Sequence, residues 1–148
     1  MVVEFAILCP IFVVLLCAVI ENGLILFTQT LMDNGTRDAA RIIMLGNATS
    51  QSFTDAFCKT ACGLVPRNSL QINVVSGATF AGLNSTLQTD SNGNMVNTQF
   101  NPGTAGQAVL VRVGYNRQFM IPLFGTFSGA KSELLVSTVT LKSEPYSQ

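Results

Sequence analysis

Residues 5–20 read FAILCPIFVVLLCAVI, a run of sixteen residues that contains no charge. Two carboxylates, Glu4 and Glu21, flank the run, and apolar residues resume beyond Glu21 as far as Met32. A membrane-spanning helix needs about 20 mostly apolar residues. A cleaved secretory signal would begin with basic residues, and this chain begins Met-Val-Val-Glu. The remaining hundred or so residues offer too little surface to bury the segment in a soluble core. We therefore predict that residues 5–32 form a helix that enters a membrane.

The composition of the whole chain excludes several classes of function. The 148 residues include eight Lys and Arg, eight Asp and Glu, and no His or Trp, and charged residues make up 11%, against about 25% in an average soluble protein. Fourteen of the sixteen charges lie in residues 33–148. A basic nucleic-acid-binding surface and histidine-based catalysis or metal binding are therefore excluded. We expect no enzymatic activity, no cofactor, no metal site and no nucleic-acid partner.

The apolar periodicity continues beyond the membrane segment with the spacing of an amphipathic helix. Apolar residues recur at intervals of three and four through residue 45, and Gly46-Asn47 is a suitable stop because both residues tolerate the left-handed conformation. We predict one helix of about 45 residues, roughly 65 Å long, in which Pro10 removes one backbone donor. Its opposite flank carries charged residues, with an attractive pair expected between the first two: Asp33, Arg37, Asp38 and Arg41.

The rest of the chain is predicted to form a globular head. Its composition becomes polar and β-branched after Gly46, which gives two domains, 1–46 and 47–148. We predict a helix over 52–62, strands over 70–75, 108–115 and 133–141, a hairpin of 79–87 with 95–100, and an apolar loop or turn over 122–129. The expected fold is α+β, with a small antiparallel sheet packed on the C-terminal half of the long helix.

The cysteines divide into two pairs. Cys9 and Cys17 lie eight residues apart in the apolar run, about 12 Å along a helix, which is too far for a bond. Cys58 and Cys62 lie one helical turn apart, within reach of a disulfide if the head is outside the cytoplasm. Residues 90–94 (DSNGN) resemble the start of a calcium loop but lack the glutamate at position twelve, so a plain turn is expected.

The flanking carboxylates have two interpretations each. Glu4 and Glu21 are about 25 Å apart on a helix, so both could lie at opposite membrane interfaces. Alternatively, Glu4 starts in an apolar setting and pairs with a cation there. Glu21 is expected either at an interface or in a polar contact between subunits.

Taken in order, several of these residues resemble a known family, the TadE-like pilins and pseudopilins of the tight-adherence branch of type IV filaments. The resemblance covers residues 1–46 and about 108–145. It is carried by Glu4-Phe5-Ala6, Pro10, Glu21-x-Gly23, the run from Arg37 to Arg41 (RDAAR), Gly46, Val111 to Tyr115, Pro122-Leu-Phe and Val139 to Pro145.

The resemblance implies a type IV pilin-like fold and an assembly pathway. Such proteins are made with a basic leader that a prepilin peptidase removes. They wait in the bacterial inner membrane with the head outside the cytoplasm, and an assembly ATPase and platform proteins then drive them into a helical filament with other pilins. Their glutamate, usually the fifth mature residue, compensates the N-terminal ammonium of a neighbouring subunit. It is residue 4 here, so the mature N-terminus is expected one residue earlier or the leader is absent from this sequence.

These observations lead to one expected function and one alternative. The first is a non-enzymatic structural subunit, a pilin or minor pseudopilin of a tight-adherence surface filament. Its assembly residues would be Glu4, Phe5, Pro10 and Glu21, and membrane lipid would surround its apolar helix before assembly. The alternative is an extracytoplasmic binding or adhesion domain that stays anchored in the membrane.

Overall fold

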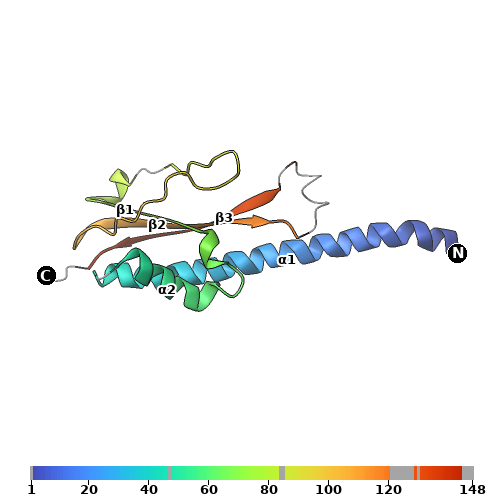
Figure 1. Cartoon of the computed structure of the whole chain (residues 1–148), viewed down its shortest axis with the longest axis horizontal. Coiled ribbons are helices and arrows are strands. Elements are labelled where there is room, and N and C mark those ends of the chain that lie inside the picture. The colour runs from blue at the N-terminus through green and yellow to red at the C-terminus, as the bar shows by residue number, and fades with distance from the viewer. Residues whose placement is uncertain (1, 47, 84–85, 121–128, 130, 145–148) are drawn as a thin grey trace.

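The computed structural model describes residues 2–46, 48–83, 86–120, 129 and 131–144. A long helix is followed by a shorter helix and an antiparallel sheet, and the chain doubles back along the C-terminal half of the long helix (Figure 1). The elements are α1 (Val2–Met44), α2 (Ser50–Ala61), η1 (Arg67–Ser69), β1 (Leu70–Gly77), η2 (Phe80–Gly82), β2 (Ala108–Gln118) and β3 (Ser132–Lys142). This confirms the predicted α+β architecture, a type IV pilin-like arrangement.

α1 is one continuous helix of 43 residues that runs through Pro10 without a break. Its charges suit the helix dipole, with Glu4 in the first turn and Arg41 in the last. The helix ends where the sequence predicted, because Gly46 adopts a positive φ of 81° and donates its N–H to the carbonyl of Ile43. The other predicted stop residue, Asn47, lies outside the described residues.

The sheet has the order β1-β2-β3, and both pairings are antiparallel. Each strand is longer than the apolar pattern indicated, most clearly at the end of β2. There Asn116, Arg117 and Gln118 continue the ladder opposite Leu134, Glu133 and Ser132. Polar side chains concealed this extension, since backbone pairing does not require apolar side chains once the register is set.

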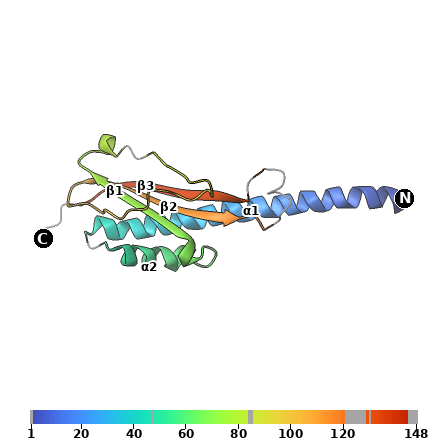
Figure 2. The same cartoon turned by 45° about the horizontal axis from the view of Figure 1, so that its top comes forward.

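Both helices cover the same face of the sheet, with α2 antiparallel to the end of α1 (Figures 1 and 2). The covered face of β2 presents Val109, Val111 and Val113, all fully buried. The core that they join is formed by α1, α2 and all three strands. Its other members are Met32, Ala39, Ala40, Ile43, Phe53, Phe57, Ala61, Val65, Val74, Leu135 and Leu141.

α2 begins two residues earlier than predicted. The sequence suggested a start at Ser52, but Thr49 caps the helix: its Oγ1 accepts the N–H of Ser52 at 3.1 Å, and the Oγ of Ser52 accepts the N–H of Thr49 at 2.9 Å. Ser52 is therefore the third helical residue of a capping box. This start places Phe53 and Phe57 on the buried face.

The predicted hairpin of 79–87 with 95–100 is wrong. Its first half contains the 3-10 turn η2, and Thr89 and Met95 form an isolated bridge around the turn. Phe100 instead lies beside β1, where Val74 donates its N–H to Gln99 and accepts the N–H of Asn101. The outer edge of β1 supplies hydrogen-bond partners for these backbone groups, whereas an isolated two-stranded hairpin is only marginally stable. The predicted loop over 122–129 lies, apart from Gly129, outside the described residues.

Candidate functional site

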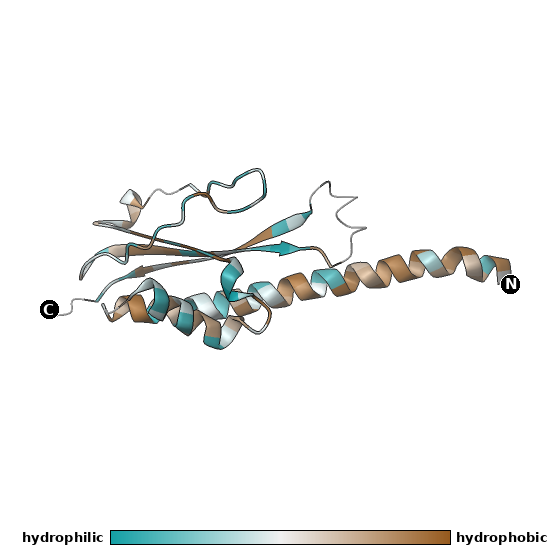
Figure 3. Ribbon diagram, in the orientation of Figure 1, coloured by the Kyte–Doolittle hydropathy of each residue, from teal (hydrophilic) through white to brown (hydrophobic). Residues whose placement is uncertain are grey.

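The N-terminal half of α1 is an apolar surface that the head leaves uncovered. It projects beyond the sheet and α2, and its ribbon is predominantly apolar (Figures 1 and 3). Phe5, Ile11 and Val19 are 71%, 63% and 63% exposed. The most apolar window of 18 residues has a mean hydropathy of 2.8, and none of it is buried. By length and composition α1 fits a single-pass membrane anchor, and a surface of this kind indicates a membrane or protein interaction.

Three of the predicted assembly residues lie on this surface. Glu4 is exposed in the first turn of α1, between Val3 and Phe5, which are 72% and 71% exposed. A carboxylate is favourable there because the helix dipole is positive at its N-terminus. Pro10 is also exposed. These three residues lie where lipid or another chain would cover them.

Glu21, the fourth predicted assembly residue, is buried against the head. It is 3% exposed, and its Oε1 lies 2.6 Å from Nη1 of Arg117 in an ion pair within the chain. The N–H of Met120 donates to the same oxygen at 3.4 Å, while Oε2 is buried and has no hydrogen-bond donor among the described residues. Within the chain the head itself supplies a cation for Glu21, and the expected position at a membrane interface or in an intersubunit contact stays a prediction.

Arg117, the partner of Glu21, is a buried cation that the sequence pattern did not indicate. It lies on the covered face of β2 because alternate residues of a strand share a face, and Val113 is two places before Tyr115 and four before Arg117 on that face. An arginine on a buried face requires an acidic partner. Extending the predicted strand of 108–115 by two residues would have placed this cation against the long helix.

The charged flank of α1 consists mainly of residues facing solvent. Arg37, Asp38 and Arg41 are exposed, and Asp38 accepts a hydrogen bond from the hydroxyl of Thr60 in α2 at 3.0 Å. The expected Asp33–Arg37 ion pair does not form among the described residues.

The reason is a competing contact of Asp33. Its Oδ1 accepts from Nε2 of Gln29 at 3.2 Å, and the same nitrogen donates to the carbonyl of Val136 in β3 at 3.1 Å. This bridge draws the carboxylate toward the sheet. The four charged residues therefore act in helix–head contacts and on a solvated face.

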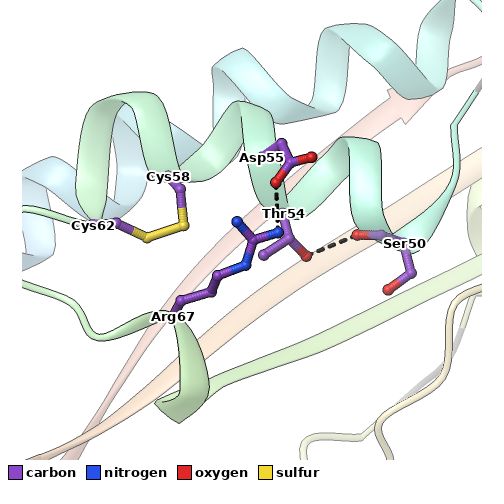
Figure 4. Close-up of a disulfide and its surroundings, with 6 residues drawn as sticks. All are labelled: Ser50, Thr54, Asp55, Cys58, Cys62 and Arg67. Carbon is purple, nitrogen blue, oxygen red and sulfur yellow. Dashed lines mark hydrogen bonds and ion pairs between the residues drawn. A yellow bond between two sulfur atoms is a disulfide. The ribbon is translucent and has the colours of Figure 1, made fainter.

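Cys58 and Cys62 form a disulfide in the structure, across the C-terminal end of α2 (Figure 4). An exposed ion pair between Asp55 and Arg67 lies beside it and joins α2 to η1. Two thiols, Cys9 and Cys17, are free. The disulfide closes one helical turn, so it constrains the end of α2 and leaves the long helix unrestrained.

The outer face of the sheet carries an open polar groove of about 1010 Å³ beside the turn at residues 90–94. Asp90 closes this turn, as its Oδ1 accepts the N–H groups of Asn92 at 2.9 Å and Asn94 at 2.7 Å. The Asn94 N–H is the main reason that the pKa of the Asp90 carboxyl lies below its ordinary value. The loop's own donors thus occupy Asp90, and no group of three His, Cys, Asp or Glu residues gathers in the described part of the chain.

Comparison with known proteins finds a family match over most of α1. No curated protein and no solved structure matches the chain. Residues 1–41 match the model of the family described as TadE-like protein, a structural, pilus-related family. The matched region contains Glu4, Phe5, Pro10 and Glu21 together with Asp33, Arg37, Asp38 and Arg41, so the N-terminal helix is similar to that family.

Proposed function

We propose that this protein is a structural subunit, a pilin or minor pseudopilin, of a tight-adherence filament. The observation that carries the proposal is the uncovered half of α1: an apolar helix, exposed on all sides, with a carboxylate in its first turn. The match of residues 1–41 to the TadE-like family supports it. The chain would be held in the bacterial inner membrane first and would then join other copies or related pilins.

Moving the apolar half of α1 from the bilayer into a filament is physically reasonable. Lipid tails and a bundle of identical apolar helices are similar environments for residues 5–20, so leaving the bilayer need not cost much hydrophobic free energy. Glu4 would set how far α1 enters the filament, because a carboxylate buried among apolar helices requires a cation. In a filament the N-terminal ammonium of a neighbouring copy would supply that charge.

The head would lie outside the cytoplasm. The Cys58–Cys62 disulfide supports this orientation, because disulfides persist in oxidising compartments and are rare in the cytosol. Assembly would then require the platform proteins, ATPase and prepilin peptidase that such filament systems use.

Glu4→Ala tests the assembly role. The variant should enter the membrane fraction as the wild type does and be strongly depleted from sheared surface filaments. Glu4→Gln separates charge from shape and should be depleted to a similar degree. Glu144→Ala, which removes an exposed carboxylate of the head, is the matched control and should assemble normally. Normal filaments from Glu4→Ala would contradict the proposed role, and exclusive retention of the wild type in the membrane would favour a permanently anchored binding domain.

A further inference from the structure

The apolar run before Glu21 is too short to span a bilayer by itself. Residues 5–20 extend about 24 Å at 1.5 Å per residue, whereas a hydrocarbon core is about 30 Å thick. Exposed apolar side chains resume beyond Glu21, where Leu26 and Phe27 are 69% and 55% exposed. The helix from Phe5 to Phe27 is about 34 Å long and would span the core.

A span that reaches Phe27 places Glu21 below the membrane surface. Phe27 is the sixth residue after Glu21, about 9 Å farther along the helix axis. An unpaired carboxylate at that depth is costly, and such groups pair with one another or line the interior of a bundle. Glu21 meets this condition within its own chain, since it is 3% exposed and lies 2.6 Å from the Arg117 guanidinium.

Arg117 lies near the end of β2, and this end of the sheet points toward the N-terminal half of α1 (Figures 1 and 2). Arg117 is the second-last residue of β2, so wherever Glu21 lies, this end of the head must lie as well. Met120 follows it, donates its N–H to Glu21 and is 70% exposed. Lys131, exposed just before β3, and Glu133, exposed within it, make the surrounding rim polar and of mixed charge.

We propose that, before assembly, residues 117–120 of the head are immersed in the bilayer at the depth of Glu21, below the membrane surface, where Arg117 neutralises Glu21 and Met120 contacts lipid. The occupant of this surface is the bilayer itself, without selectivity for a headgroup. The inference rests on the membrane placement of α1 under the proposed function. It assigns the buried ion pair a task beyond fastening the head: it lets a helix interrupted by a carboxylate span the full bilayer.

Tryptophan fluorescence measures this depth directly, because the chain contains no Trp. Three single-Trp variants of the full chain would be placed in phosphatidylcholine vesicles with brominated acyl chains, which quench nearby indoles. Met120→Trp reports on the proposed surface. Phe12→Trp, at a site 60% exposed on the uncovered helix, reports on membrane insertion. Phe80→Trp, at a site 54% exposed in η2, reports on the opposite end of the head (Figure 1).

The expected result is loss of emission from Phe12→Trp and Met120→Trp in brominated relative to unbrominated vesicles, with a blue-shifted spectrum for both, and no loss from Phe80→Trp. Equal behaviour of Met120→Trp and Phe80→Trp, with Phe12→Trp quenched, would overturn the inference and leave the membrane helix intact. An unquenched Phe12→Trp would overturn the membrane placement of α1 itself. All three sites are more than half exposed, so the substitutions should leave the fold unchanged.

Discussion

The two halves of α1 belong to one uninterrupted helix and have opposite relations to the rest of the chain. In the N-terminal half Phe5 is 71% exposed, whereas in the C-terminal half Met32 and Ala39 are fully buried against the head. Glu21 marks the boundary, as the first residue of α1 that a head residue buries. The hydrophobic core of the head, as the described residues form it, therefore contains none of the first twenty residues.

The largest difference in stability is expected between two variants that each lose one phenylalanine side chain, one in the head and one in the uncovered half of α1. Phe57 of α2 is fully buried against the C-terminal half of α1, so Phe57→Ala should lower the free energy of unfolding by about 3–5 kcal/mol. Phe12→Ala removes the same group from the uncovered half and should change it by less than about 0.5 kcal/mol. Denaturant unfolding of both full-length variants in detergent measures the difference. Similar losses would show that the apolar half is part of the folded core.

The second prediction removes one charge of the Glu21–Arg117 ion pair, which lies at the boundary between the two halves of α1. Arg117→Gln leaves Glu21 buried without its cation and should destabilise the head by about 3 kcal/mol, at the lower end for a broken buried pair. The double variant Glu21→Leu/Arg117→Met should recover most of that loss, because apolar replacement of a buried pair is often neutral or stabilising. Thermal unfolding in detergent gives both values. A single variant as stable as the wild type would mean that the pair does not hold the head to α1.

The smallest difference in stability is expected between alanine substitutions at two glycines of α1. A Cβ on Gly35 would lie 3.1 Å from the Phe57 ring and 3.2 Å from Cβ of Ala61, and both neighbours are fully buried. Gly35→Ala should therefore destabilise the head by about 1 kcal/mol through overpacking. A Cβ on Gly23 has nothing within 4 Å, so Gly23→Ala should be neutral or slightly stabilising through helix propensity. Melting temperatures measured side by side test the pair, and a stabilising Gly35→Ala would show that the helix interface has spare room.

Sequence reasoning succeeded where the pattern was local and strong. The uninterrupted apolar run and the periodicity that follows it predicted α1 to within two residues of its end, and alternation predicted the three strands. It failed where long-range pairing decided the outcome. In the described part of the chain, the segment over 95–100 bridges its neighbour only at Met95 and then pairs with β1 at Phe100, and no local signal marks that change of partner.

The candidate site divides in the same way. Glu4, Phe5 and Pro10 lie on the uncovered surface that their sequence pattern indicated. The partner of Glu21 is 96 residues away in the chain, so it could be found only by extending β2 and noticing that an arginine faced the core. The Gln29 bridge to β3 likewise replaced the local Asp33–Arg37 pair with a tertiary contact.

The central claim is that the uncovered half of α1 leaves the membrane and enters a filament. The most direct measurement is the mass of the wild-type chain recovered from sheared surface material, with peptide coverage of residues 5–20. We predict that the intact chain, apolar helix included, is abundant in that fraction. Finding the chain only in the membrane fraction, or a released head that lacks residues 5–20, would contradict the claim.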